Sequence, residues 1–333
     1  MFDPHMGGKQ STTENILSRF ATSSPHPPKC RQCTSTQTRN RGTLPKGRKF
    51  ADQSLNPPLP GGNLYECANC RLVFRYPILQ ESEYEALYET VSGEYWESNG
   101  LRGDQRKICD VIRQRFSSGK ILDVGCYDGA LLSSLGDAYE KFGVEASQEA
   151  AKISSKRRVC IVASKIRELE HIHDSEFDVI TAVNVIEHVH DPKGFIKALS
   201  LKLKPGGVLI ISTGNAHAPS WAWLGARFWY CALPDHLSFI SPQWSLKVAE
   251  ELGLKLSEVT EFRYNPSTGM RAIYEWLELP LKCFISAFEM LIIRQLSSTA
   301  KKLGPRLCLG RRGMFKDHFL AVFVKNLPCR ARY

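Results

Sequence analysis

Two pairs of cysteines have a spacing that suits metal binding. Each pair has the pattern Cys-x-x-Cys, formed by Cys30 and Cys33 and, after 33 residues rich in turn formers, by Cys67 and Cys70. Two such pairs that face each other supply four thiolates in a tetrahedral array, the ligand set of a structural Zn2+. We therefore expect a zinc-ribbon-like segment over residues 30–76. The alternatives are two unrelated pairs in a flexible region and, less favoured, a redox dithiol.

A loop with two glycines follows the first strongly apolar run after residue 118. It reads Asp123-Val-Gly125-Cys126-Tyr127-Asp-Gly129. A dinucleotide-binding loop would need a glycine in place of Tyr127, and the Gly-Lys-Ser/Thr ending of a P-loop is missing. Gly125 allows a sharp turn after a strand, and Gly129 allows the next helix to begin close to a ligand. The loop therefore predicts a ligand site and disfavours a nicotinamide cofactor or a cradled phosphate.

Strands and helices alternate from residue 120 onward and place this loop at the edge of a sheet. Apolar runs predict strands at 121–125, 142–145, 159–162, 177–183, 207–212, 255–263 and 319–324. Helical patterns lie at 81–89, 104–116, 131–135, 148–156, 192–203 and 241–252. Buried strands separated by helices indicate an α/β fold with a doubly wound, mostly parallel sheet. Ligands of such sheets bind at the carboxyl ends of the strands.

The loop and its downstream landmarks resemble the class I S-adenosylmethionine-dependent methyltransferases. Asp123, Gly125 and Gly129 match the family's D-x-G-x-G-x-G motif, with Tyr127 in place of the middle glycine. Further landmarks follow in the family's order, namely Glu145, Asn184-Val-Ile-Glu187-His188-Val189 and Leu203-Lys-Pro-Gly-Gly207. The resemblance covers about residues 100–325. It implies a Rossmann-like sheet of seven strands whose last strand is antiparallel.

The same resemblance implies where S-adenosylmethionine binds. Glu145 stands where the family's acidic residue accepts hydrogen bonds from both ribose hydroxyls, and Ser164 stands where an acidic or amide residue often meets the adenine. Relatives that bind Mg2+ at the fourth-strand loop carry a glutamate at the position of Asn184, so we do not expect that metal. The implied cofactor residues are Asp123, Gly125, Cys126, Tyr127, Gly129, Glu145, Ala146, Ser164, Asn184 and Val185.

Three histidines are candidates for the base that deprotonates the methyl acceptor. Methyl transfer is an in-line displacement, for which a protein must align the nucleophile and remove its proton. His236 stands where relatives place a histidine close to the acceptor, and we prefer it to His188 and His217. The alternative for each is a structural or solvated histidine.

Five aromatic residues between positions 221 and 230 predict either an acceptor pocket or lid that excludes water, or structural packing. A helical stretch at 273–303, inserted before the last strand, is expected to close the same pocket or to bind a partner or membrane surface. Its apolar tract is interrupted by charges, which disfavours a membrane-spanning helix and leaves weak contact with a membrane surface open.

Composition excludes collagen-like, coiled-coil and wholly disordered classes, because 43% of the 333 residues are hydrophobic. The net charge of +10 is the sum of +6 in residues 1–62, +8 in residues 301–333 and −4 between them. This acidic central part disfavours a nucleic-acid partner. No secretory signal is apparent and the 11 cysteines are odd in number, so we expect a cytoplasmic protein.

The expected function is methylation of a small-molecule acceptor, with oxygen as the preferred nucleophile of a hydroxylated metabolite, sugar or lipid. The alternatives are C-methylation of a deoxysugar, RNA methylation, and an inactive scaffold with the same fold. We expect a mobile tail over 1–29, a zinc-binding segment over 30–76, a helical lid or linker over 77–117 and the methyltransferase domain over 118–333. The oligomeric state stays open.

Overall fold

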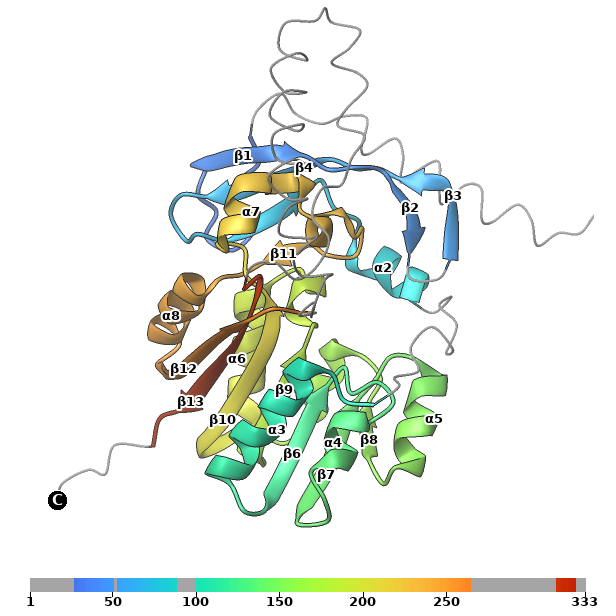
Figure 1. Cartoon of the computed structure of the whole chain (residues 1–333), viewed down its shortest axis with the longest axis vertical. Coiled ribbons are helices and arrows are strands. Elements are labelled where there is room, and N and C mark those ends of the chain that lie inside the picture. The colour runs from blue at the N-terminus through green and yellow to red at the C-terminus, as the bar shows by residue number, and fades with distance from the viewer. Residues whose placement is uncertain (1–26, 51–52, 89–99, 265–315, 328–333) are drawn as a thin grey trace, which may run out of the picture.

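The computed structural model describes residues 27–50, 53–88, 100–264 and 316–327, without the side chain of Trp223 (Figure 1). Most of the predicted tail and all of the predicted helical stretch at 273–303 lie outside the described residues. The described part contains a large sheet flanked by helices and, next to it, a smaller sheet formed mainly by the N-terminal residues. We call residues 27–50 and 53–88 the N-terminal module.

The large sheet has seven strands in the order β12-β13-β10-β9-β6-β7-β8. Their bounds are β6 Gly119–Val124, β7 Tyr139–Val144, β8 Cys160–Ala163, β9 Phe177–Val183, β10 Leu203–Gly214, β12 Leu254–Phe262 and β13 His318–Lys325. The five strands from β6 to β10 are parallel, and β13 is antiparallel to both of its neighbours. The predicted α/β sheet with an antiparallel last strand is confirmed.

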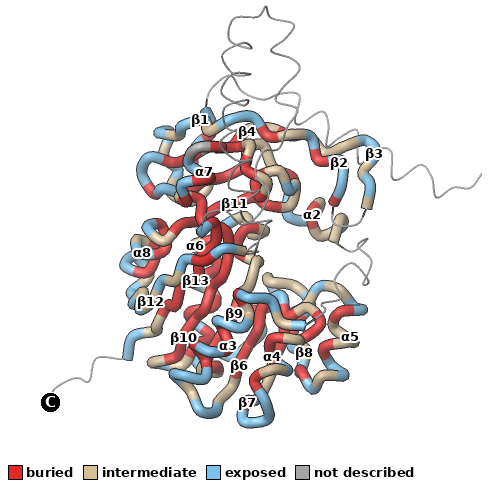
Figure 2. The backbone as a smooth tube through the Cα atoms, viewed as in Figure 1, coloured by how far each residue is buried: buried red, intermediate tan, exposed pale blue. Residues whose placement is uncertain are grey.

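Alternating side chains of the central strands face two separate layers of helices. Leu122 and Ile180 pack in a core with α6 (Pro192–Lys202) and α8 (Pro242–Glu251). Their neighbours Ile121 and Val179 face the opposite core, formed with α3 (Gly103–Arg115) and α4 (Ala130–Ser134). Figure 2 shows this buried interior as a continuous red column along the strands. Successive side chains of a strand point to opposite faces of the sheet, so neighbouring residues of one strand contact different layers of helices.

Side-chain hydrogen bonds cap the N-terminal ends of the helices in these layers. Asp191 accepts a hydrogen bond from the N–H of Gly194 at the start of α6, and Ser241 accepts one from Trp244 at the start of α8. Both helices have a proline in the first turn, where its missing N–H costs nothing. The third major helix of the parallel half, α5 (Gln148–Lys156), is capped by Ser147.

The N-terminal module contributes three strands to a second, four-stranded sheet. Its order is β1-β4-β5-β11, with β1 Thr38–Thr43, β4 Asn63–Cys67, β5 Val73–Tyr76 and β11 Ser238–Phe239. A hairpin of β2 (Gly47–Phe50) and β3 (Gln53–Leu59) and the helix α2 (Glu81–Tyr88) complete the module. The strands between the two cysteine pairs are a finding, because the turn-rich sequence predicts no strand there. The fourth strand comes from the other half of the chain.

Residues that follow β10 pack into the module. The segment contains α7 (Pro219–Leu224), η4 (Gly225–Arg227) and η5 (Trp229–Ala232) before it reaches β11. Its side chains Trp221 and Phe228 share a buried core with Leu64 and Val73 of the module. The module and the large sheet are therefore joined by apolar packing as well as by strand pairing.

Candidate active site

Three loops meet at the carboxyl edge of the large sheet, because β7, β6 and β9 are neighbours. Gly125 follows β6, Glu145 follows β7 and Asn184 follows β9. The chain order reverses between β6 and β9, so this edge is the switch point at which ligands of doubly wound sheets bind. The predicted glycine loop thus lies at the predicted edge.

The backbone of the glycine loop lies against its neighbours with no room for larger side chains. Gly125 is exposed and has a φ of +73°, and a Cβ at this position would lie 2.7 Å from Cγ2 of Val185. A Cβ at Gly129, with a φ of +74°, would lie 2.6 Å from the hydroxyl of Ser154. Tyr127 also has a left-handed φ of +58°. It adopts at the middle position of the motif the conformation that glycine adopts readily.

Two carboxyl groups stand beside this loop. Glu145 accepts hydrogen bonds from the backbone N–H groups of Tyr127 and Ser147, each at 2.8 Å, and burial raises the pKa of its carboxyl. Asp123 is buried, accepts a 2.6 Å hydrogen bond from the Thr181 hydroxyl, and has its pKa raised to about 7 by burial. Glu145 is therefore held in a fixed orientation, and the hydrogen bond between Asp123 and Thr181 joins the ends of β6 and β9.

The loop after β9 carries an uncommon backbone conformation. Asn184 has a φ of +54°, and its N–H donates to the carbonyl of Ser212. Its side-chain oxygen is buried and has no hydrogen-bond partner among the described residues. An unpaired buried acceptor costs free energy unless a ligand supplies the donor. The neighbouring Val185 is half-buried and packs against Gly125.

A buried polar cluster lies directly after that loop. Both carboxylate oxygens of Glu187 accept hydrogen bonds, one from the Thr213 hydroxyl at 2.9 Å and one from the Tyr230 hydroxyl. Burial, together with the adjacent Glu187, raises the pKa of Tyr230 well above its ordinary value. Glu187, His188 and His236 offer possible ligand atoms within 4.8 Å of one another. Because both oxygens of Glu187 already accept hydrogen bonds from hydroxyl groups, we interpret the group as a hydrogen-bonded cluster.

His188 and His236 are brought together by this cluster. Their rings are 4.8 Å apart in an edge-to-face arrangement. Nδ1 of His188 lies 2.9 Å from the Tyr88 hydroxyl and 3.1 Å from the carbonyl of Asp235. Nδ1 of His236 is buried and has no hydrogen-bond partner among the described residues. Burial, then the charges of His188 and Arg75, hold the pKa of His236 well below its ordinary value, so its ring is neutral at pH 7.

Two other predicted site residues make different contacts. The third histidine, His217, lies 2.6 Å from Gln243 through Nδ1 and 3.4 Å from Glu66 of the N-terminal module through Nε2. Ser164 is exposed and its hydroxyl donates to Glu168, which also accepts from the Ser164 N–H. Among the described residues, neither side chain forms a hydrogen bond or a ring contact with His188 or His236.

The four cysteines of the predicted metal site lie together. Their sulfur atoms are all within 4.8 Å of one another, and the pairs Cys30–Cys70 and Cys33–Cys67 are each 3.5 Å apart. The N–H of Cys70 also points to the sulfur of Cys67 at 3.5 Å. A hydrogen bond from Cys70 lowers the pKa of the Cys30 thiol. The sequence-predicted pairing of the two Cys-x-x-Cys turns is therefore present in the fold.

Comparison of the sequence with known proteins identifies its family. A family model described as a methyltransferase domain matches residues 101–259. The chain is 33% identical over 169 residues to a protein of Thiobacillus denitrificans named ubiquinone biosynthesis O-methyltransferase, covering 47% of this chain and 73% of that protein. The chain belongs to the class I S-adenosylmethionine-dependent methyltransferases. A protein of Escherichia coli O157:H7 with the same name is 28% identical to this methyltransferase over 218 residues, covering 58% of this chain and 90% of its own.

Solved structures of S-adenosylmethionine-dependent methyltransferases also align with this one. A protein of Thermotoga maritima, described as a possible histamine N-methyltransferase, has a TM-score of 0.44 at 17% identity and covers 73% of this chain and 94% of its own. None of the helices in the described part of this methyltransferase combines the length and the hydropathy that spanning a lipid bilayer requires.

The aromatic segment of this methyltransferase is mostly core. Trp221, Phe228 and Tyr230 are buried, which agrees with the structural alternative for these three rings. Trp229 is half-buried and stacks on His318 at 6.4 Å between ring centroids. Trp223 lies in α7, and its side chain is outside the described residues.

Sequence reasoning missed several residues that surround His236. Tyr88, Thr213 and Arg75 reach this cluster from elements far apart in the chain, and no local sequence motif predicts such contacts. One signal was available, because Arg75 follows the second cysteine pair in an otherwise apolar run, where a charged residue needs an unusual partner.

Proposed function

We propose that this methyltransferase transfers a methyl group from S-adenosylmethionine to a hydroxyl oxygen of a small molecule, with His236 as the base. The observation that carries this proposal is the buried, unpartnered Nδ1 of His236 beside the loop that follows β9. The two relatives named ubiquinone biosynthesis O-methyltransferase support oxygen as the nucleophile.

The loops at the sheet edge fit the cofactor. When bound, S-adenosylmethionine supplies an electrophilic methyl group on a positively charged sulfur. Glu145, whose oxygens each accept one backbone hydrogen bond, keeps lone pairs for the two ribose hydroxyls. The exposed backbone of Gly125 allows close approach, and the unpaired oxygen of Asn184 can accept from the ligand. Cys126, Tyr127, Ala146 and Val185 would line the same space, while the hydroxyl of Ser164 is engaged with Glu168.

The surroundings of His236 suit proton removal. A neutral imidazole can accept a proton, and its lowered pKa keeps it neutral at physiological pH. His236 Nδ1 takes the proton of the acceptor hydroxyl as that oxygen bonds the methyl carbon and the carbon–sulfur bond breaks toward sulfur. His188 is less suited, because its Nδ1 already contacts Tyr88 and Asp235.

We also propose a structural Zn2+ on Cys30, Cys33, Cys67 and Cys70. Tetrahedral zinc with sulfur ligands at about 2.3 Å requires sulfur–sulfur distances near 3.8 Å. The observed distances of 3.5 Å in two pairs, and of at most 4.8 Å in all, are close to that arrangement. Three of the four cysteines are buried, which suits a closed structural site.

The test compares His236→Asn with His188→Asn in an assay for S-adenosylhomocysteine, run with phenolic, sugar and lipid alcohols. For the acceptor that turns over, we expect kcat to fall about 100-fold or more in His236→Asn and less in His188→Asn, with S-adenosylmethionine affinity unchanged. In the parent enzyme the acidic limb of kcat/KM should lie below pH 6.5, because the pKa of His236 is lowered from that value. A kcat within threefold of the parent in His236→Asn would exclude it as the base.

A further inference from the structure

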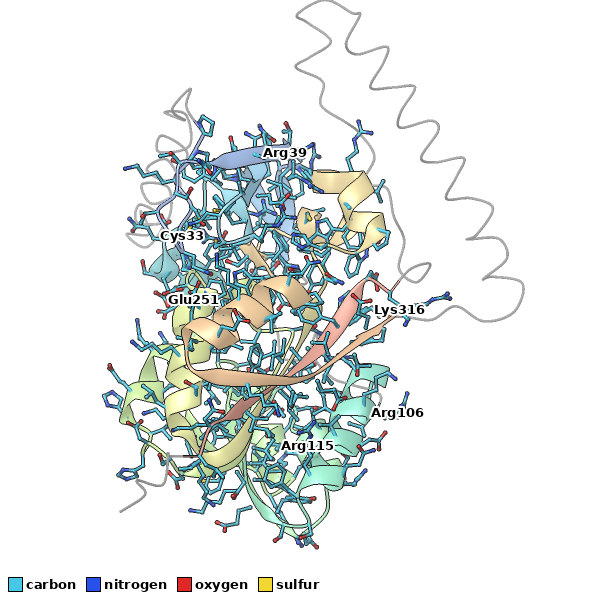
Figure 3. All side chains as sticks on the ribbon, turned by 90° about the vertical axis from the view of Figure 1, so that its left-hand side faces the viewer. Cys33, Arg39, Arg106, Arg115, Glu251 and Lys316 are labelled. Atoms are coloured by element: carbon cyan, nitrogen blue, oxygen red, sulfur yellow. The ribbon has the colours of Figure 1, made fainter. Side chains whose placement is uncertain are left out.

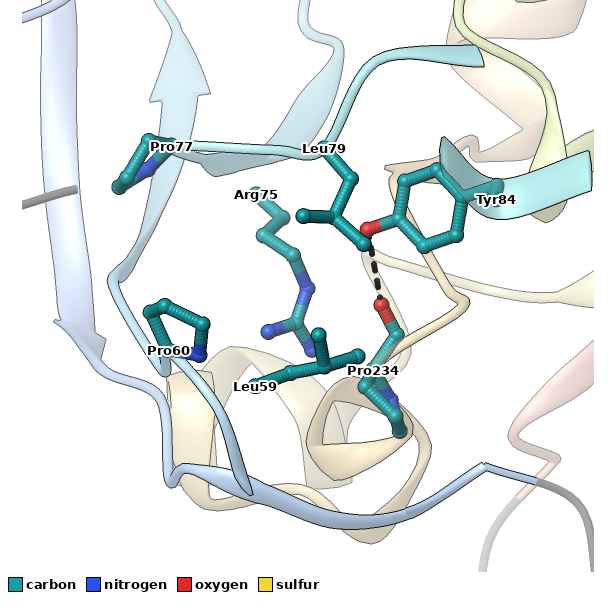
Figure 4. A pocket seen from close by; sticks show the side chains of 7 residues that line it. All are labelled: Leu59, Pro60, Arg75, Pro77, Leu79, Tyr84 and Pro234. Atoms are coloured by element: carbon teal, nitrogen blue, oxygen red, sulfur yellow. Dashed lines mark hydrogen bonds between the residues drawn. The ribbon is translucent and has the colours of Figure 1, made fainter. Parts of the chain in front are cut away.

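The segment that carries His236 is irregular, and the N-terminal module holds it by its carbonyl groups. Arg75 of β5 is 2% exposed, and its guanidinium donates four hydrogen bonds to backbone carbonyls. Three of these belong to the His236 segment, namely Cys231 at 2.7 Å, Leu233 at 2.8 Å and His236 itself at 3.1 Å. The fourth is the carbonyl of Gly61 at 3.2 Å. In Figure 4 the guanidinium points toward Leu59, with Pro60 on one side and Pro234 on the other.

No acidic side chain of the described residues forms an ion pair with Arg75. Burial lowers the pKa of its guanidinium, so the charge is held at a cost that the carbonyl dipoles and the nearby Asp235 carboxylate partly offset. The planar guanidinium offers five N–H donors in a fixed geometry, whereas a lysine offers three donors around one atom. This position therefore requires several N–H donors in one plane, and not only a positive charge.

A second arginine of the module reaches the next part of the segment. Arg31 lies between Cys30 and Cys33, and it donates to the Leu237 carbonyl at 2.8 Å and to the Ser238 hydroxyl at 2.9 Å. The hydroxyl of Tyr84, in α2, donates to the Pro234 carbonyl at 3.1 Å (dashed line in Figure 4). Contacts from the cysteine turn, from β5 and from α2 thus converge on residues 231–238.

We propose that Arg75 is a positioning residue for the acceptor side of the active site, with Arg31 as its second support. The inference rests on the proposed role of His236 in catalysis. The N-terminal module then serves the reaction because it fixes the backbone on which the base stands. A displacement of the base by about 1 Å would reduce turnover roughly 100-fold while leaving the cofactor loop intact.

The test uses the full chain with its metal and compares Arg75→Lys, Arg75→Met and Arg31→Met. The matched control is Arg39→Met, which removes a charge from an exposed position of the same module (Figure 3). Amide hydrogen exchange of residues 231–238 should increase in the Arg75 and Arg31 variants, while α5 and the control variant stay unchanged. We expect kcat to fall about 10- to 100-fold in Arg75→Met, with the affinity for S-adenosylmethionine within twofold.

A double variant separates this inference from the proposed function. If Arg75 acts through the base, Arg75→Met should lower kcat no further in a His236→Asn background. If His236→Asn alone keeps full activity, the base assignment is wrong, and the hydrogen-exchange result still decides whether Arg75 orders the segment. Unchanged exchange at 231–238 in both Arg75 variants would overturn the inference. If Arg75→Met does not fold, Arg75→Lys provides the same test, because lysine keeps the positive charge but lacks the planar set of N–H donors.

Discussion

Glu145 is subject to two opposing effects at the scale of a single residue. Burial raises the pKa of its carboxyl, while the N–H groups of Ser147 and Tyr127 lower it, and the net direction is upward. The same two hydrogen bonds orient the carboxylate across the ends of β6 and β7. Because a carboxylate binds a diol only through free lone pairs, cofactor binding should weaken as the pH falls toward this raised pKa.

We predict that Glu145→Ala weakens S-adenosylmethionine binding by roughly 10- to 100-fold, the range expected for lost hydrogen bonds to a charged group. Titration calorimetry with the purified enzyme measures the effect. Glu149→Ala, which alters an exposed glutamate in the first turn of α5, is the control and should bind normally. An affinity within twofold of the parent in Glu145→Ala would show that the cofactor lies elsewhere.

The residues of the glycine loop could be predicted from the sequence, because the chemistry there is local. Gly125 and Gly129 have the positive φ values that their residue type suggests, and Glu145 follows its strand as expected. The role of Arg75 could not be predicted, since three of its four acceptors lie about 160 positions further along the chain. Only the tertiary fold determines which backbone carbonyls are buried and therefore need a hydrogen-bond donor.

At the scale of elements, the two cysteine turns lie against α8. Trp244 donates to Gln32 in the first turn, and Lys247 donates to the carbonyl of Asn69 in the second. The sequence predicted the facing turns from spacing alone. It did not predict β1 or β4, because the turn-rich stretch between the cysteine pairs lacks the alternation of a strand and is ordered by its partners.

We predict about one Zn2+ per chain by elemental analysis of the purified protein, lost in Cys67→Ser. The loss should also lower the melting temperature, because Cys67 ends β4 and is fully buried. Cys160→Ser, at an exposed cysteine of β8, is the matched control and should keep its metal. Equal metal content in the two variants would refute a zinc site on the four cysteines.

At the scale of the whole molecule, the module and the large sheet share a hydrophobic interior. One core contains Cys67 and Phe74 of the module together with Phe177, Ile211 and Trp244. This sharing makes independent unfolding of the module costly, since its loss would expose side chains of the large sheet. The division of the chain into four parts, with boundaries after residues 29, 76 and 117, remains a prediction from the sequence.

We predict a single cooperative transition for the chain in scanning calorimetry. Removing the metal with a strong chelator should lower that one melting temperature, because the apolar cores are shared. The ratio of calorimetric to van't Hoff enthalpy provides the measurement. A separate early transition that appears on chelation, with the main transition unmoved, would show that the module unfolds by itself.

The position of β13 has a consequence for synthesis of the protein. This strand lies between β10 and β12, yet it is the last of the three to be translated. Until residues 318–325 have left the ribosome, β10 has one unpaired edge and β12 has no neighbour in the sheet. The nascent chain therefore presents open strand edges until then, which makes it a candidate client for chaperones that shield such edges.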